Sequence, residues 1–294
     1  MRSPSSSLAI PLLLVSLVVV LPLSSAMAAT TARLAGQRVL VTGGGRGIGR
    51  AIALICYKEG AKVAVSSRTQ SDLDETASLA LGLSCAAATE GRTIDTYISD
   101  VTKEQDVESM VESIMERWGG IDVLVNNAGG GQATKGPLET LQTDDLRRLL
   151  ELNVVGVHAV TSSVLRKAML PAQSGRIVNI SSRAGKVGLP NYSFYVASKF
   201  ALEGMTASLA EELKDKNILV NTLSPGMVDT KSFPKPPGRK GVRSAESVED
   251  GLFTILESGM TGHYLHVDEL DEARGKGLDD SIAMKPIREN VFLS

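Results

Sequence analysis

The stretch RVLVTGGGRGIGRAIALICYKEGAKVAVSSR, residues 38–68, decides the fold of this chain. It begins with a short apolar run, turns through a cluster of glycines, and continues as a longer helical pattern. A second apolar run, AKVAVSSR, closes the stretch. A strand, a helix and another strand in this order predict two parallel strands joined by a crossover helix.

The same alternation continues along the chain. Three further segments, IDVLVNNAG (121–129), GRIVNISS (175–182) and ILVNTLSPG (218–226), repeat a strand followed by a loop. The segments between them are long enough to form helices on both faces of a parallel sheet. We therefore predict an α/β fold with a doubly wound parallel sheet, built as a single domain from residues 29–294. Ligands of such sheets bind beyond the carboxyl ends of the strands, where these loops lie.

The glycine-rich turn has the features of a dinucleotide-binding loop. Gly43, Gly47, Ile48 and Gly49 follow a predicted strand and open a predicted helix. Glycine permits positive φ angles and a close backbone approach, and the N–H groups at a helix start attract a pyrophosphate. A glycine cluster alone is equally typical of a tight turn, so the flanking strand and helix carry the prediction. The turn lacks the Lys-Ser/Thr pair of a P-loop.

The residues after the second predicted strand indicate the choice of cofactor. An NAD-preferring site places an acidic residue here to hold the ribose 2′-hydroxyl, whereas this chain has Ser67 and Arg68. Arg68, together with Arg46 in the glycine turn, suits a 2′-phosphate because a guanidinium is a planar, permanently charged donor. We therefore predict NADP(H) over NAD(H). In the alternative interpretation both arginines are solvated loop charges.

Tyr195 and Lys199 stand four residues apart in YVASK, and Ser182 precedes the tyrosine by thirteen residues. A spacing of four places the phenol and the ammonium on one helical face, so we expect the positive charge to lower the tyrosine pKa from about 10. A tyrosine tuned in this way transfers a proton near neutral pH. The pattern, beside the glycine turn, predicts a nicotinamide-dependent reductase.

From about Leu34 to Asp268 the chain resembles the short-chain dehydrogenase/reductase family. The resemblance rests on motifs in the family's order and spacing: TGGGRGIG (42–49), DVT (100–102), NNAG (126–129), LNVVG (152–156), NISS (179–182), YVASK (195–199) and SPGMVDT (224–230). It implies a Rossmann fold and the interconversion of an alcohol and a carbonyl compound with a nicotinamide cofactor.

The resemblance also implies a role for the motif residues. Tyr195 is implied to be the general acid of carbonyl reduction, Ser182 to steady the substrate oxygen, and Lys199 to hydrogen-bond the nicotinamide ribose. Asn153 is implied to keep a water in a proton relay. The full set of expected cofactor contacts is Gly43, Arg46, Gly47, Ile48, Gly49, Ser67, Arg68, Asp100, Val101, Asn127, Ala128, Gly129, Tyr195, Lys199, Pro225, Gly226, Val228 and Thr230.

The expected function is the reduction of a small carbonyl compound, or the reverse oxidation of an alcohol. The substrate classes in view are a ketone, an aldehyde, a ketosteroid and a 3-oxoacyl thioester. The alternative is a catalytically idle relative that binds NADP(H) as a sensor or scaffold. A hydrolase is disfavoured because Ser182 lacks the G-x-S-x-G context of a nucleophile elbow.

A basic loop at about residues 227–247 is expected to form a short substrate lid. Its cations are Lys231, Lys235, Arg239, Lys240 and Arg243. These charges are either solvated or hold an anionic substrate such as a phosphopantetheine thioester.

The end of the chain departs from the family pattern. Residues from about 269 to 294 form an extension where many members of the family finish sooner. In those members the shorter ending helps to build a tetramer, so tetramer formation is in doubt here. A predicted helix at residues 143–169, which pairs subunits in the family, favours a homodimer.

Composition excludes several partners. The chain has 31 basic and 33 acidic residues, so its net charge of -2 favours neither nucleic acid nor a membrane surface. Cys56 and Cys85 lack the spacing of a metal site or a disulfide framework and are interpreted as small buried hydrophobes. The three histidines lack a ligand set nearby in sequence, so we expect no metal.

The first residues are typical of a secretory signal peptide. Residues 8–23 form an uncharged apolar run, and Ala26-Met27-Ala28 fits the small-x-small cleavage rule. We expect cleavage after Ala28 and a place in the secretory pathway, such as the endoplasmic reticulum, or outside the cell. The alternatives are an uncleaved membrane anchor at residues 8–23 with a cytosolic catalytic domain, and an organelle location.

Overall fold

The structure, a computed structural model, describes residues 32–83, 93–231 and 233–287. These residues belong to one compact unit that spans Thr31–Ser294. The expected leader at residues 1–28, Cys85 and the last residues of the C-terminal extension lie outside the described residues. None of the helices within the described ranges has the length and apolar character needed to span a bilayer.

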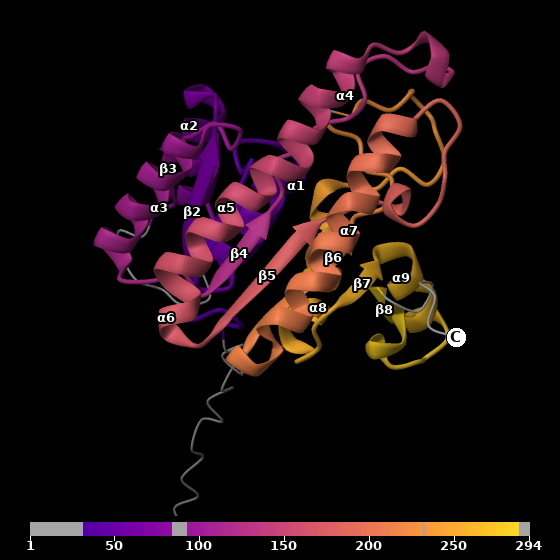
Figure 1. Cartoon of the computed structure of the whole chain (residues 1–294). Coiled ribbons are helices and arrows are strands. Elements are labelled where there is room, and N and C mark those ends of the chain that lie inside the picture. Colours follow the sequence, from indigo (N-terminus) through magenta and orange to yellow (C-terminus); the bar gives the residue numbers. More distant parts are fainter. Residues whose placement is uncertain (1–31, 84–92, 232, 288–294) are drawn as a thin grey trace, which may run out of the picture. The chain divides into compact units, whose positions relative to one another are not determined.

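The centre of the fold is a mostly parallel sheet (Figure 1). In the described part of the chain the strand order is β3-β2-β1-β4-β5-β6-β7-β8. Neighbouring strands run parallel from β3 to β7, and β8 pairs antiparallel with β7. The strands are β1 Arg38–Thr42, β2 Lys62–Ser67, β3 Asp95–Ile98, β4 Val123–Asn126, β5 Gly175–Ile180, β6 Ile218–Ser224, β7 His263–His266 and β8 Met284–Pro286. The predicted α/β fold with a doubly wound parallel sheet is confirmed.

Strand β1 lies between β2 and β4, which is where the winding direction of the sheet changes. The chain proceeds outward from β1 to β3 and then returns to β4 on the other side of β1. In open α/β sheets the crevice beyond the carboxyl ends of such strands is the usual ligand site. The carboxyl ends of β1 and β4 carry Thr42 and Asn126, which lead into two of the predicted motifs.

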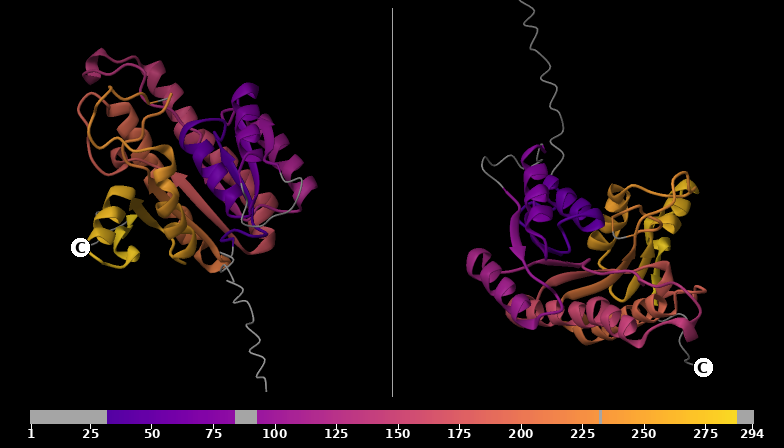
Figure 2. Two further views of the ribbon diagram at one scale, coloured as in Figure 1. Left: turned by 180° about the vertical axis from the view of Figure 1, so that it is seen from behind. Right: turned by 90° about the horizontal axis from the view of Figure 1, so that it is seen from above.

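Helices cover both faces of the sheet (Figure 2). Helices α3, α5 and α7 pack on one face, and α1, α2 and α8 pack on the other. The helices are α1 Gly47–Lys58, α2 Gln70–Leu81, α3 Glu104–Trp118, α4 Thr143–Leu150, α5 Gly156–Val164, α6 Leu170–Ala172, α7 Ser193–Leu213, α8 Glu249–Glu257 and α9 Val267–Gly275.

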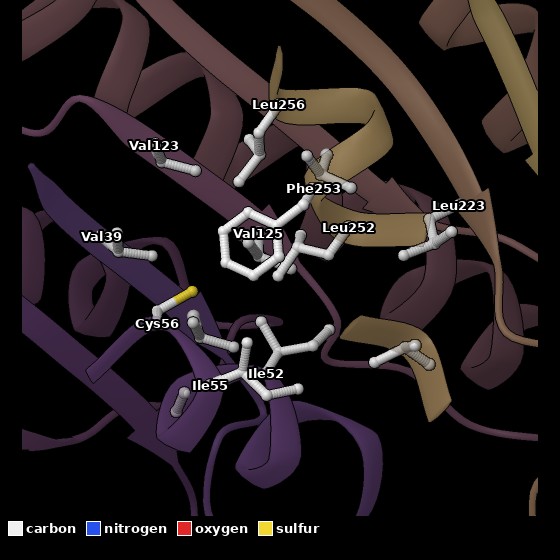
Figure 3. Packing of buried hydrophobic residues seen from close by; sticks show 14 of the residues in the cluster. Val39, Ile52, Ile55, Cys56, Val123, Val125, Leu223, Leu252, Phe253 and Leu256 are labelled. Atoms are coloured by element: carbon white, nitrogen blue, oxygen red, sulfur yellow. The ribbon is translucent and has the colours of Figure 1, made fainter. Parts of the chain in front are cut away.

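Figure 3 shows the core between the sheet and the α1 and α8 layer. Phe253 and Leu252 of α8 pack with Ile52 and Cys56 of α1 against Val125 of β4. All five side chains are buried, and Cys56 is the buried hydrophobe that the sequence predicts. Burial raises the pKa of its thiol to about 12, so the group stays uncharged. This packing fixes α1, and with it the glycine turn, on the sheet.

Residues 143–169 form the helix that the sequence predicts, with two π-helical turns in it. Helix α4 passes into a π-helical turn at Glu151–Val155, continues as α5, and passes into another at Leu165–Met169. The backbone keeps right-handed helical angles at each junction. A π-helical turn inside an α-helix frequently marks a functional position. The first of the two contains Asn153.

The C-terminal extension adds structure beside β7. Helix α9 follows β7 directly, and β8 then returns antiparallel with Met284 opposite Leu265. Arg243 in the expected lid donates from Nη1 to the carboxylates of Asp268 and Asp271 in α9, at 2.9 and 2.6 Å. The extension therefore anchors the end of the lid.

Candidate active site

The glycine turn adopts conformations and contacts that require glycine. Gly43 and Gly47 have φ angles of +65° and +56°, in the left-handed region that side chains disfavour. A Cβ atom on Gly49 would lie 2.3 Å from Asn127 Nδ2 and 2.4 Å from the Gly43 carbonyl oxygen. The turn is therefore packed directly on the loop that follows β4.

Asn127 braces the turn from that loop. Its Nδ2 donates to the carbonyl oxygens of Thr42 and Gly43, at 3.0 and 3.1 Å. The Thr42 hydroxyl accepts from the backbone N–H groups of Asn127 and Ala128, at 3.1 and 3.0 Å. These four hydrogen bonds join the carboxyl ends of β1 and β4 at the point where the winding direction changes.

Arg50 of α1 supports the other side of the turn, a contact that the motifs do not indicate. Its Nε donates to the Gly45 carbonyl oxygen and to Thr76 Oγ1, both at 3.0 Å. Its Nη1 pairs with Glu75 at 2.7 Å. Among the described residues no side chain caps the start of α1 at Arg46, so the first N–H groups of the helix can serve an anion.

A cavity of about 170 Å³ lies beside the turn. Most of the expected cofactor contacts line it, namely Gly43, Arg46, Gly47, Ile48, Ser67, Arg68, Asp100, Val101, Asn127, Ala128, Gly129 and Thr230. The glycine cradle, the helix N-terminus and the polar strand ends fit the pyrophosphate and adenosine half of a dinucleotide.

The two arginines expected at a 2′-phosphate both reach this cavity, and each faces a carboxylate. Arg46 Nη1 lies 3.8 Å from Asp72 Oδ2, and Arg68 Nη1 lies 3.8 Å from Asp100 Oδ2. Burial raises the pKa of Asp100, but hydrogen bonds from Thr102 and the Arg68 charge outweigh it, so the pKa is lowered overall. Both guanidinium groups are farther from these carboxylates than a direct hydrogen bond allows.

A larger cavity of about 810 Å³ adjoins the first. The two cavities share Ile48, Asn127, Gly129, Thr230 and Phe233 in their linings. The other expected site residues that line the larger cavity are Ser182, Tyr195, Lys199, Pro225, Gly226 and Val228. The shared lining joins the two cavities into one crevice at the carboxyl ends of the strands.

Ser182 and Tyr195 meet in this crevice. Ser182 follows β5 and caps the 3₁₀ turn Arg183–Gly185, where its Oγ accepts from the Ala184 N–H at 3.1 Å. Its hydroxyl also lies close enough to the Tyr195 phenol to lower the pKa of that group. Burial raises the pKa of Tyr195, and the effect of the Ser182 hydroxyl offsets only part of that rise.

Lys199 lies on the same helix face as Tyr195, as the spacing predicts. Its Nζ donates to the Ile180 carbonyl oxygen at 2.9 Å and lies 5.9 Å from the Tyr195 ring centroid. Burial lowers the pKa of Lys199 to about 8, against the opposing effect of Glu203. The expected lowering of the Tyr195 pKa by Lys199 is therefore not observed. The ammonium points at a backbone oxygen, and burial dominates at the phenol.

Asn153 lies in the first π-helical turn and is 1% exposed. Its Oδ1 accepts from the Gly130 N–H at 2.9 Å, and its Nδ2 donates to the Gly130 carbonyl oxygen at 3.0 Å. Nδ2 also donates to Ser198 Oγ at 3.0 Å. Asn153 thus joins the loop after β4 to α7, and its role in a water relay stays a prediction.

Gln132 positions the helix that carries Tyr195, although no motif contains it. Its Oε1 accepts from the backbone N–H groups of Phe194 and Tyr195, at 3.1 and 3.2 Å, in the first turn of α7. Its Nε2 donates to the carbonyl oxygens of Thr134 and Asn191, at 2.8 and 3.1 Å. A buried amide with every donor and acceptor used fixes the start of α7.

Comparison with known proteins agrees with this geometry. Residues 37–236 match the family model described as short chain dehydrogenase. The 3-oxoacyl-(acyl-carrier-protein) reductase FabG of Thermotoga maritima is 34% identical over 221 residues, which cover 75% of this chain and 86% of that protein.

Two of the solved structures that resemble this chain match it over about four fifths of its length. An actinorhodin polyketide ketoreductase with NADPH has a TM-score of 0.70 and 31% identity, covering 79% of this chain and 95% of that one. An NAD⁺-bound xylitol dehydrogenase has a TM-score of 0.70 and 30% identity, covering 80% and 98%. The two neighbours carry different nicotinamide cofactors.

Proposed function

Because the chain belongs to the short-chain dehydrogenase/reductase family, we propose that it is an NADP(H)-dependent enzyme that reduces a carbonyl group to an alcohol or catalyses the reverse. One observation carries the proposal. Ser182, Tyr195 and Lys199 line a cavity that continues into the cavity beside the glycine turn. Proton donors and a dinucleotide cradle thus share one crevice.

The residues of the crevice suit the charge that develops in carbonyl reduction. Negative charge grows on the carbonyl oxygen, so hydrogen-bond donors must already point at it. Ser182 supplies one donor, and Tyr195 supplies the proton; its raised pKa suits an acid that holds the proton until the oxygen becomes basic. Lys199, whose pKa is about 8, is positive near pH 7 and offsets charge that develops on Tyr195.

The cofactor supplies the hydride for reduction and accepts it for oxidation when bound. The glycine turn and the start of α1 would hold its pyrophosphate, and Asp100 and Val101 would hold its adenine side. Lys199 would hydrogen-bond its ribose. The residues expected at its nicotinamide end are Pro225, Gly226, Val228 and Thr230.

The preference for NADP(H) is supported by Arg46 and Arg68 beside the smaller cavity. The 2′-phosphate of NADPH would accept charge-assisted hydrogen bonds from these arginines in place of their distant carboxylate partners. Such hydrogen bonds should contribute about 1.5–3 kcal/mol to the free energy of cofactor binding. Arg46→Ala and Arg68→Ala should therefore raise the KM for NADPH about tenfold or more and leave the KM for NADH nearly unchanged. Arg147→Ala, on the exposed surface of α4, is the matched control. Wild-type kcat/KM in favour of NADH would reject the preference.

An anionic carbonyl substrate, such as a 3-oxoacyl thioester with a phosphopantetheine tail, is supported by the rim of the larger cavity. Lys135, Lys235 and Arg239 belong to its lining. Burial and the charges of Arg239 and Lys135 lower the pKa of Lys235, which places these cations near one another. A comparison of acetoacetyl-coenzyme A with its neutral N-acetylcysteamine analogue tests whether these cations bind an anionic substrate or are only solvated charges of the lid. Removing the three charges should raise KM for the first substrate only.

The central experiment follows NADPH and NADH absorbance at 340 nm with quinones, aldehydes, ketosteroids and 3-oxoacyl thioesters. Tyr195→Phe keeps the ring and removes the proton, so turnover should fall at least about a hundredfold while NADPH still binds. Turnover that survives in Tyr195→Phe would contradict the assigned chemistry. NADPH binding without turnover of any carbonyl in the wild type would favour the sensor or scaffold.

We also propose a homodimer and entry into the secretory pathway. Val155 and Phe200, 45% and 46% exposed on contacting helical segments, support pairing through the 143–169 helix and α7. Light scattering of the wild type and of Phe200→Glu tests the dimer.

Residues 1–28 would direct the protein into the secretory pathway, and the alternative is a membrane anchor at residues 8–23. The mass of the mature protein tells whether residues 1–28 are removed. Its protection from added protease tells on which side of the membrane the catalytic domain lies.

A further inference from the structure

Glu203 is a buried carboxylate in α7, one helical turn beyond Lys199 and 3% exposed. Its Oε1 accepts from the Ser181 hydroxyl, and its Oε2 accepts from Thr222 Oγ1 at 3.1 Å. Oε2 also pairs with Lys186 Nζ at 3.3 Å. Burying a carboxylate is costly unless it is paired and hydrogen-bonded, and this one is both.

Two of the three partners of Glu203, Ser181 and Lys186, belong to the segment that carries Ser182, and the third, Thr222, lies in β6. Ser181 directly precedes Ser182, and its backbone N–H donates to the Leu223 carbonyl oxygen of β6 at 2.8 Å. A Cβ atom on Gly185 would lie 3.0 Å from Glu203 Cγ, so the 3₁₀ turn capped by Ser182 packs on the Glu203 side chain. The carboxylate therefore joins α7, β6 and the segment after β5 at the position of Ser182.

Glu203 follows Lys199 by four residues on α7, so the two buried side chains lie on one face of the helix. Its carboxylate favours the protonated form of Lys199, against the effect of burial. Three further titratable groups face this pair: Tyr195 beside Lys199, and Lys186 and Tyr264 beside Glu203. Burial raises the pKa of both phenols, so they are neutral near pH 7. The carboxylate of this cluster is therefore that of Glu203, whose pKa is raised by burial against the opposing effects of the Lys186 charge and the hydrogen bonds from Ser181 and Thr222.

We infer that Glu203 is a positioning residue of the active site, which holds the Ser182 segment in place and places a carboxylate one helical turn from Lys199 on α7. The inference rests on the proposed function, in which Ser182 and Lys199 assist proton transfer by Tyr195. Loss of the charge should lower activity most at alkaline pH, because Lys199 would release its proton sooner. Loss of a hydrogen bond alone should lower kcat by the same factor at every pH.

The test separates charge from hydrogen bonding. Glu203→Gln removes the charge and keeps the shape, whereas Glu203→Asp and Thr222→Val keep the charge and weaken the hydrogen bonds. In the pH profile of kcat, the alkaline limb of Glu203→Gln should move to lower pH by about one unit. The limbs of the other two variants should stay at the wild-type position. Glu212→Gln makes the same change at an exposed position of α7 and should leave the profile unchanged.

A second measurement needs neither turnover nor a folded variant at position 203. Carbon-13 NMR of the lysine Cε atoms follows the protonation of Lys199, whose signal is assigned by its loss in Lys199→Met. Coupled groups titrate in two steps, so the wild-type Lys199 signal should show a second, acid step as Glu203 takes up a proton.

Two outcomes would overturn the inference. One is a Glu203→Gln variant whose kcat falls by one factor at all pH values, and the other is a wild-type Lys199 signal without the acid step. A wild-type protein that turns over no carbonyl compound contradicts the proposed function alone, because the NMR titration still decides the role of Glu203.

Discussion

Replacing Lys199 by methionine should abolish turnover and, at the same time, stabilise the fold. Methionine has a similar length and volume and carries no charge, so the packing around position 199 is retained. Lys199 is 8% exposed, and burial lowers its pKa from 10.5 to about 8. The folded state therefore holds a charge that would be more stable in water.

The size of the effect follows from this pKa difference. The difference of 10.5 minus 8, about 2.5 units, corresponds to about 3 kcal/mol. The hydrogen bond from Nζ to the Ile180 carbonyl oxygen acts in the opposite direction and is worth about 1 kcal/mol. We expect Lys199→Met to be more stable than the wild type by about 2 kcal/mol at pH 7.

The difference should depend on pH in one direction. Below pH 8 the lysine is protonated in the folded and unfolded states, so the full cost of burying the charge is present. Between pH 8 and pH 10.5 the unfolded chain binds more protons than the folded protein, so the wild type gains stability as pH rises. The advantage of Lys199→Met should therefore shrink across this window.

Guanidinium unfolding of both proteins from pH 7 to pH 10 measures the difference. Lys214→Met, at an exposed lysine just after α7, is the control and should change stability by less than about 0.5 kcal/mol. A Lys199→Met variant that is less stable than the wild type, or a difference that is constant with pH, would refute the reasoning.

Three shorter predictions concern the turn, the core and the lid. Gly49→Ala should weaken NADPH binding in a fluorescence titration and lower the free energy of unfolding by about 1–3 kcal/mol, because a Cβ would overlap Asn127. Gly204→Ala is the control: a Cβ there meets nothing within 4 Å, so this change should raise the Tm. Equal effects of the two changes on the Tm would contradict the prediction. Phe253→Ala should cost about 3–5 kcal/mol in guanidinium unfolding, and a cost below about 1 kcal/mol would show that the core refills the space. Arg243→Met should raise the KM for the carbonyl substrate and leave the affinity for NADPH unchanged, because it removes the ion pairs that hold the lid to α9. An unchanged substrate KM would show that these ion pairs do not position the lid.

The features that the sequence predicts are those with local signals. The strand, glycine turn and helix of residues 38–68 are adjacent in the chain, and glycine at positions 43 and 47 meets a backbone requirement of the turn itself. Tyr195 and Lys199 share a helix face because their spacing alone places them there. Residues at strand ends converge because parallel strands present their carboxyl ends at one edge.

The features that the sequence does not predict depend on contacts between distant segments. Gln132 caps α7 from a loop about sixty residues away, and Glu203 accepts from the hydroxyl of Ser181, just after β5, and from that of Thr222 in β6. The raised pKa of Tyr195 has the same origin, because burial is a property of the packed crevice rather than of the YVASK spacing. Asp72, which faces Arg46, lies on a helix that no motif includes.

The antiparallel pairing of β8 with β7 has a consequence for the protein at high concentration. An unpaired edge strand offers a row of N–H and C=O groups to which a strand from another molecule can add. Here Met284–Pro286 occupies that position on β7, and Pro286 has no N–H to donate further. The last described strand thus gives β7 a partner from within the same chain. Removing residues 276–287 should leave β7 as an unpaired edge, to which a strand of another molecule can add.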